Sequence, residues 1–289
     1  MASGEETALS CPICSAGRGR AVWREIGIQL LRCPGCRHVW SDYQQPGPGD
    51  HYWGDARPAV DGAQERYWYH ARRPCYRQFL RRFASMRGHV VDVGAGLGFF
   101  VKEALEAGWR AEGWEMSPGA VAWGRGQIGI SALHAGRVEE AGLAPGSVDA
   151  ITLWDVIEHL PDPVSLLRWA HETLRPGGLL FLQTPNVDFQ LVRARLQRRL
   201  RGLSEEVSLL EASEHLNDFS VRSMRAALAK AGFERSRFLV MLPTLSLAGG
   251  SGRVGAAAKL GWWGVAAAVH AVSGGRANLS NTLHVAAWR

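Results

Sequence analysis

Four cysteines stand in two pairs whose spacing is typical of a metal site. Cys11 and Cys14 form "CPIC", and Cys33 and Cys36 form "CPGC", so the pattern is C-x2-C-x18-C-x2-C. Two tight turns of this kind can present four thiolates to one tetrahedral ion and leave no open position for a substrate. The alternative, two disulfides, needs an oxidising compartment. We therefore predict one structural Zn²⁺ held by these four cysteines.

A glycine-rich loop is the second pattern that could do chemistry. In "VVDVGAGLGFF", Gly94, Gly96 and Gly98 stand between an apolar run and a predicted helix. Loops of this kind hold nucleotide-like cofactors, but a dinucleotide site has the spacing G-x-G-x-x-G, and here the third glycine comes one position earlier. Asp92 would also repel a pyrophosphate, whereas it suits a cationic ligand. Spacing and charge together disfavour NAD.

Further polar residues follow the later strands. Glu115 ends "RAEGWE", where a carboxylate can accept hydrogen bonds from two ribose hydroxyls. For proton removal we predict His215 in "SEHLNDFS" first and His159 in "IEHLPDP" second, because neutral imidazole can accept a proton at cellular pH. Asp155 is the carboxylate alternative. A capping or packing role remains an equal alternative for each histidine.

The segments around these residues alternate between strand and helix patterns. Such alternation predicts a parallel sheet covered on both faces, with ligands at the carboxyl ends of the strands. The expected strands are 90–93, 110–115, 132–136, 147–155 and 177–185, and the expected helices between them are 99–107, 118–125 and 162–174.

Joined to "VDAITLWDVIEHLPDP" and "LRPGGLLFLQTPN", these motifs resemble the class I S-adenosylmethionine-dependent methyltransferases over roughly residues 88–240. The resemblance implies an α/β fold, with a Rossmann-like doubly wound seven-stranded sheet, and S-adenosylmethionine as cofactor. It also implies which residues contact the cofactor. By this likeness the methionine part lies against Asp92, Gly94, Ala95, Gly96 and Gly98, the ribose against Glu115, the adenine against Met116 and Val138, and the methyl group near Trp154 and Asp155.

One position departs from the family pattern. Where the family often has an acidic residue beside the adenine, the loop "GRVEEA" has Arg137 followed by Val138. The contact to the adenine amino group therefore remains open.

Together these patterns predict that the chain has three regions. They are a zinc-ribbon-like module at 1–48, a helical connector or cover at 49–88, and a methyltransferase domain at 89–289. In the connector, Pro74 is expected to separate two helices. The aromatic residues of this region could cover the site or pack between helix and sheet. They are Tyr67, Trp68, Tyr69 and Tyr76.

Two late strand patterns, at 235–243 and 281–289, enclose an expected insertion at about 243–282. It contains "VGAAAKLGWWGVAAAVHAV", residues 254–272, in which Lys259 and His270 make a membrane-spanning helix a poor fit. We expect a helix with Trp262 and Trp263 on one face. It could cover an apolar acceptor, contact a membrane surface or be buried against the domain.

The distribution of charge along the chain indicates whether nucleic acid is an expected partner. Residues 1–88 hold 13 arginines and 8 acidic residues, net +5, whereas residues 89–289 are net +1. A nearly neutral large domain argues against a nucleic-acid partner. The amino-terminal residues lack the pattern of a secretory signal, so we expect a cytoplasmic protein.

Three functions remain at this point. The first is methylation of oxygen or nitrogen on a small-molecule, sugar or glycan acceptor. It is favoured because a zinc ribbon before such a domain resembles bacterial methyltransferases of that kind. The second is an RNA methyltransferase, for which "RARLQRRLR" at 193–201 offers five arginines. The third is a non-catalytic binding module.

Overall fold

The structure is a computed structural model and describes residues 10–43, 69–244 and 252–289. The expected connector before residue 69, including Tyr67 and Trp68, lies outside the described residues. The helix expected before Pro74 lies largely outside the described residues. Pro74 itself lies in the first turn of helix α2 (Arg73–Arg82), where a proline does not remove an internal helix hydrogen bond.

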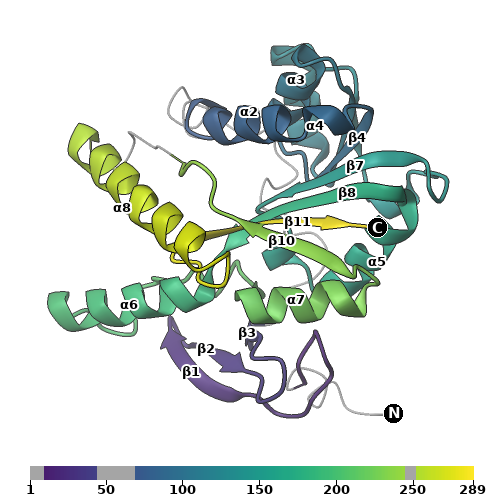
Figure 1. Ribbon diagram of the computed structural model, residues 1–289. Helices are drawn as coiled ribbons and strands as arrows, with labels where there is room; N and C mark the ends of the chain where they lie inside the picture. Colours follow the sequence, from purple (N-terminus) through teal and green to yellow (C-terminus); the bar gives the residue numbers. More distant parts are fainter. Residues whose placement is uncertain (1–9, 44–68, 245–251) are drawn as a thin grey trace.

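A seven-stranded sheet forms the centre of the molecule (Figure 1), with the strand order β10-β11-β8-β7-β4-β5-β6. Neighbouring strands run parallel except β11, which is antiparallel to both β8 and β10. The predicted doubly wound seven-stranded sheet is confirmed, with the last strand reversed. The strands are β4 (His89–Val93), β5 (Arg110–Glu115), β6 (Leu133–Ala135), β7 (Val148–Trp154), β8 (Leu174–Pro185), β10 (Arg235–Leu239) and β11 (Thr282–Trp288).

Helices cover both faces of the sheet, with α2, α3 and α4 on one side and α5 and α7 on the other (Figure 1). Several begin at capping side chains: Ser117 accepts a hydrogen bond from the backbone N–H of Ala120, and Asp162 from that of Ser165. The remaining helices are α3 (Phe99–Glu106), α4 (Pro118–Gln127), α5 (Pro163–Thr173), α6 (Val187–Arg201), α7 (Val221–Lys230) and α8 (Gly252–Val272).

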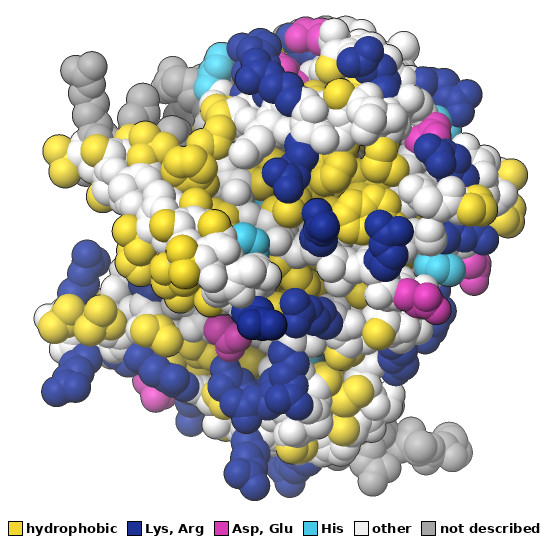
Figure 2. All heavy atoms as spheres, viewed as in Figure 1, with side chains coloured by type: hydrophobic (Ala, Val, Ile, Leu, Met, Phe, Trp, Pro, Cys, Tyr) yellow, Lys and Arg dark blue, Asp and Glu magenta, His cyan; other side chains and the backbone are white. Residues whose placement is uncertain are grey.

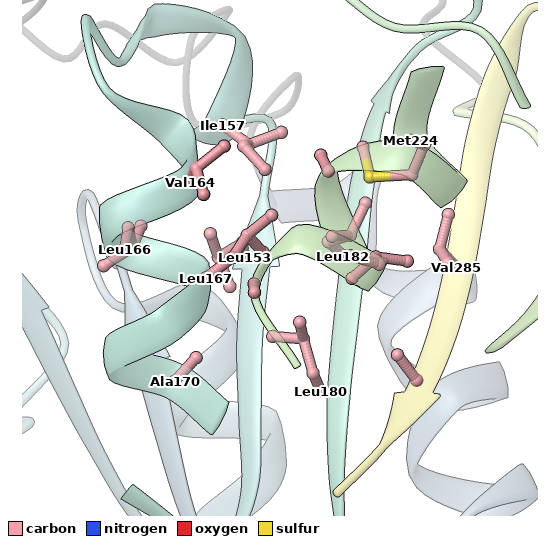
Figure 3. Close-up of a cluster of buried hydrophobic side chains, with 14 of the residues drawn as sticks. Leu153, Ile157, Val164, Leu166, Leu167, Ala170, Leu180, Leu182, Met224 and Val285 are labelled. Atoms are coloured by element: carbon pink, nitrogen blue, oxygen red, sulfur yellow. The ribbon is translucent and has the colours of Figure 1, made fainter. Parts of the chain in front are cut away.

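Each face of the sheet has its own apolar core. On the α5–α7 side, Leu153, Leu180 and Leu182 of the strands meet Leu167 and Met224 of the helices (Figure 3). On the α2–α3 side the core is aromatic and includes Phe79, Phe100, Trp154 and Phe181. Burial on both faces explains why the central residues of β7 and β8, 150–154 and 179–182, are mostly apolar.

The cysteine-containing segment forms a second, smaller sheet of order β1-β2-β3-β9. Strands β1 (Arg20–Glu25), β2 (Ile28–Arg32) and β3 (Val39–Ser41) come from this segment, whereas β9 (Asn217–Asp218) comes from the later chain. Its apolar side packs on α6, where Trp23 and Leu30 share a core with Leu191. The amino-terminal segment is therefore continuous with the rest of the fold.

Glu25 ties this small sheet to the loop that follows α6. The side chain is fully buried, and its carboxylate accepts hydrogen bonds from the backbone N–H groups of Leu209, Leu210 and Ala212 and from the hydroxyl of Ser208. These hydrogen bonds outweigh burial, so the pKa of Glu25 lies below its usual value. One carboxylate thus fixes the shape of a loop far along the chain.

The expected insertion between the last two strands contains a long helix, α8, as predicted. α8 and α6 project from the same side of the molecule (Figure 1). They meet where the ring of Trp262 lies 5.6 Å from that of Phe189. Among the described residues, no helix is long and apolar enough to cross a membrane.

Candidate functional site

The glycine-rich loop connects β4 to α3 at the carboxyl end of the sheet. Gly94 and Gly98 have φ angles of +66° and +84°, a region that side chains other than glycine rarely adopt. A Cβ atom at Gly94 would lie 2.6 Å from Val156, and one at Gly98 would lie 2.6 Å from Leu133. Both positions therefore need glycine for conformation and for space.

Glu115 reaches this loop from the end of β5. Its carboxylate accepts hydrogen bonds from the backbone N–H groups of Gly96 and Ser117, both at 2.9 Å. The residue is largely buried, while the neighbouring Met116 is 41% exposed. Val138, the other residue expected beside the adenine, is buried in the 3-10 turn Val138–Glu140. All three residues line the cavity described below.

Asp92 lies beneath the same loop and is almost fully buried. It accepts a hydrogen bond from the Thr152 hydroxyl at 2.6 Å. Burial, and then the charge of Glu115, raise the pKa of Asp92 to about 8. A positively charged ligand nearby would favour its carboxylate form, which agrees with the cationic ligand expected from the sequence.

Asp155 stands at the end of β7 in an uncommon backbone conformation, with φ at +53°. Its Oδ2 accepts hydrogen bonds from the Arg72 guanidinium at 2.5 Å and from the Gln183 amide at 2.8 Å. The preceding Trp154 packs against Tyr76, with ring centroids 4.8 Å apart. Three elements, β7, β8 and the start of α2, therefore orient this carboxylate.

The two predicted histidines lie together. Their ring centroids are 5.0 Å apart, although 56 positions separate them in the chain. Nδ1 of His159 lies 2.9 Å from the Glu214 carbonyl oxygen, and Nε2 of His215 lies 3.4 Å from the Glu211 carboxylate. Burial lowers the pKa of His215 to about 4, so its ring is neutral at cellular pH.

A cavity of about 1290 Å³ joins these groups. Cavities for one drug-sized ligand are about 300–1,000 Å³, so this one has room for a cofactor and a second molecule. It runs from the glycine loop and Glu115, past Asp155, to the two histidines and to Trp262 of α8. The predicted cofactor end and acceptor end are thus parts of one space.

Several residues of the site were not singled out in the sequence. Arg72, Gln183 and His284 all line the cavity. Nε2 of His284 lies 3.1 Å from Oε1 of Gln183, which connects β11 to the Asp155 cluster. None of these residues belongs to a spaced motif, so the sequence carries no local signal for them. Cys75, the fifth cysteine of the chain, is buried in α2, and burial raises its pKa to about 12.

The four paired cysteines converge as their spacing predicts. Their sulfur atoms all lie within 4.8 Å of one another, and the pairs Cys11–Cys36 and Cys14–Cys33 are each 3.5 Å apart. All four are free thiols. A zinc–sulfur distance of about 2.3 Å places tetrahedral ligands roughly 3.8 Å apart, so the sulfurs fit one zinc ion.

Comparisons with known proteins agree with this geometry. A family described as "Methyltransferase domain" matches residues 67–235. A Xanthomonas campestris ubiquinone biosynthesis O-methyltransferase is 32% identical over 140 residues, covering 46% of this chain and 56% of that protein. A probable S-adenosylmethionine-dependent methyltransferase of Mycolicibacterium smegmatis is 29% identical over 124 residues, covering 43% and 48%. The chain thus spans about half the length of these curated relatives.

A solved structure shows the same fold. The S-adenosylmethionine-dependent methyltransferase from Mesorhizobium loti superposes with a TM-score of 0.51 at 19% identity, over 76% of this chain and 98% of that one. The family match, the strand order and the glycine loop all lead to one assignment. The chain belongs to the methyltransferase-domain family and has the fold of the class I S-adenosylmethionine-dependent methyltransferases.

Proposed function

We propose that this protein transfers the methyl group of S-adenosylmethionine to an oxygen or nitrogen atom of a small-molecule, sugar or glycan acceptor. The observation that carries the proposal is the single cavity that joins the glycine loop and Glu115 to Asp155 and the two histidines. Oxygen is the favoured target, because the Xanthomonas relative carries the name of an O-methyltransferase.

In this proposal the residues at the ends of β4, β5 and β7 hold the cofactor. The loop from Gly94 to Gly98, with Ala95 and Gly96, takes the methionine part, and Asp92 stabilises its positive charge. The Glu115 carboxylate accepts the ribose hydroxyls, and Met116 and Val138 contact the adenine. When bound, S-adenosylmethionine supplies an already activated methyl group. The chain's main task is to align the acceptor, which can contribute about 7–11 kcal/mol.

Trp154 and Asp155 line the cavity at the end of β7. In this proposal Asp155 faces the acceptor. His159 and His215 stand on the acceptor side, where we propose that they help to activate the attacking group. The lowered pKa of His215 leaves its ring neutral, so it offers a lone pair to this region.

We also propose that the four cysteines hold a structural zinc ion, which supports the acceptor side. β3 pairs with β9, and Nε2 of His38 lies 3.0 Å from Oδ1 of Asn217. Asn217 in turn donates a hydrogen bond to the Leu160 carbonyl, next to His159. The metal-bound turns are therefore linked to the loops that carry both histidines.

The outer faces of α6 and α8 form a surface suited to contact with an anionic membrane. On α6, Val192, Leu196 and Leu200 are 63%, 54% and 73% exposed and fall on one stripe at four-residue spacing. On α8, Val254 and Val272 are strongly exposed. Figure 2 shows hydrophobic side chains on the two projecting helices, with cationic side chains beside those of α6.

Charge favours a lipid surface as the occupant of these faces. The sequence of α8 contains no acidic residue, and α6 contains one aspartate against five arginines. Arginine beside an exposed apolar stripe is the pattern of helices that lie in the interface of anionic bilayers. Trp262 and Lys259 of α8 also line the cavity, so an acceptor with an apolar part could enter from this side.

Vesicle binding tests this surface. We expect the protein to sediment with vesicles of phosphatidylcholine and phosphatidylglycerol and to bind less at high salt. Leu196→Glu with Leu200→Glu should reduce vesicle affinity at least about tenfold, since each buried leucine contributes about 1.5–3 kcal/mol. Leu105→Glu on α3 changes an exposed leucine elsewhere and should have no effect. No vesicle binding by the wild type, or equal binding by the double variant, would refute the proposal.

Acceptor fractionation tests the proposed function itself. The protein would be incubated with methyl-labelled S-adenosylmethionine and cell extract separated into RNA, lipid, glycan and small-molecule fractions. We expect label in the small-molecule, glycan or lipid-linked fractions. Label in RNA alone would support the alternative of an RNA methyltransferase, and label in no fraction would support a non-catalytic module.

A further inference from the structure

A second group of metal-ligand residues lies on the acceptor side of the cavity, apart from the cysteines. Glu158 and His159 belong to the 3-10 turn Ile157–His159 after β7, and His215 precedes β9. Each residue offers one ligand atom, and these atoms lie within 4.8 Å of one another. One carboxylate and two imidazoles are a common ligand set for transition metals.

In each of the three side chains, one polar atom has a partner that orients the side chain, as is usual for metal ligands. Ligating histidines usually bind a carbonyl or carboxylate through the second ring nitrogen, which orients the ring. Here Nδ1 of His159 faces the Glu214 carbonyl, and Nε2 of His215 faces the Glu211 carboxylate. Oε2 of Glu158 accepts a hydrogen bond from the Thr184 hydroxyl at 3.0 Å.

Two of the opposite atoms, on Glu158 and His215, lack such partners. Oε1 of Glu158 and Nδ1 of His215 are buried and have no hydrogen-bond partner within the described part of the chain. The two residues are only 1% and 7% exposed. A buried polar atom without a partner costs about 1–3 kcal/mol, and more if it is charged. A ligand that these atoms share would remove that cost.

The chemistry of the three groups favours a cation as that ligand. One carboxylate and two imidazole rings all offer lone pairs. A further carboxylate, that of Asp155, lines the same cavity.

We propose that Glu158, His159 and His215 bind a divalent transition-metal cation through Oε1 of Glu158, Nε2 of His159 and Nδ1 of His215. Two nitrogen ligands and one oxygen suit Zn²⁺, Mn²⁺, Fe²⁺ or Co²⁺ better than Mg²⁺ or Ca²⁺. Three protein ligands leave positions open toward the cavity.

The open positions give the cation a role that rests on the proposed methyl transfer. An acceptor hydroxyl bound there loses its proton to water more readily. Its oxygen then forms a bond to the methyl carbon while the carbon–sulfur bond breaks, and the electron pair stays on sulfur. The histidines would thus activate the acceptor as ligands.

Manganese binding tests the site without cofactor or acceptor. Mn²⁺ prefers oxygen and nitrogen ligands, so it will not displace zinc from four thiolates. Loss of the free Mn²⁺ signal in electron paramagnetic resonance, on protein washed with a mild chelator, should show one Mn²⁺ per chain. His159→Gln and Glu158→Gln should each weaken binding at least tenfold. His134→Gln, outside the cluster, should not.

The outcomes separate this inference from the proposed function. No Mn²⁺ binding by the wild type, or unchanged binding by a folded His159→Gln variant, overturns the site. If Glu158→Gln does not fold, His159→Gln still decides, because His159 is only partly buried. Metal binding with turnover that is insensitive to removal of the cation overturns the activating role. Failure of methyl transfer alone leaves the binding result intact.

Discussion

Replacing Glu115 by alanine should weaken binding of S-adenosylmethionine and S-adenosylhomocysteine by about 1–3 kcal/mol, the cost of unpaired hydrogen-bonding groups. That range is about 5- to 150-fold in Kd. We expect the upper end, because Glu115 acts twice. It would accept the ribose hydroxyls, and it already fixes the glycine loop through the N–H of Gly96. Titration calorimetry measures the change.

A second glutamate provides a matched control, which separates the role of Glu115 in the site from a general effect of removing one negative charge. Glu140 is exposed, belongs to the turn after β6 and does not line the cavity. Glu140→Ala should bind both ligands as the wild type does. Neither protein should bind NAD. Unchanged cofactor affinity in a folded Glu115→Ala variant would show that the ribose lies elsewhere.

Replacing Cys33 by serine should have the largest effect on stability. We expect loss of one equivalent of zinc per chain and a fall in the free energy of unfolding of more than about 4 kcal/mol, the range reached when a structural metal is lost. The loss of stability should extend beyond the cysteine-containing segment, because Trp40 and Cys33 share the core that contains Phe219 and Met224. Metal analysis and denaturant unfolding measure the two changes.

Cys75 provides the matched control, since it is a buried cysteine outside the cluster. Cys75→Ala should keep all of its zinc. Wild-type protein purified with reductant and without chelator should contain at least one equivalent. Less than about half an equivalent, or a metal-free Cys33→Ser variant of unchanged stability, would contradict the zinc assignment.

Local patterns were sufficient to predict the parts of the site that depend on local backbone geometry. The glycine loop is readable because Gly94 and Gly98 need positive φ angles and a neighbour occupies the space of a Cβ atom. The cysteine cluster could be predicted from the sequence because each tight turn sets the direction of its own thiolates. The sheet follows from alternating strand and helix patterns, and each of these signals lies within a few residues.

The rest of the site depends on pairs that are far apart in the chain. Arg72 and Asp155 are 83 positions apart, and nothing near either residue indicates the other. From the sequence, Glu25 would be predicted to be an exposed charged residue at the end of a strand. In the structure it is fully buried and accepts hydrogen bonds from a loop more than 180 positions away. The predicted ribbon also shares a sheet with β9, a pairing of only two residues that no sequence period reveals.

The most direct test of the account is a crystal structure of the protein with S-adenosylhomocysteine. We predict that the ribose hydroxyls lie within hydrogen-bond distance of Glu115, that the amino-acid part lies along Gly94–Gly98, and that the sulfur faces Asp155 and the two histidines. A nucleoside bound elsewhere, or a sulfur that faces away from Asp155, would contradict the proposed path of methyl transfer.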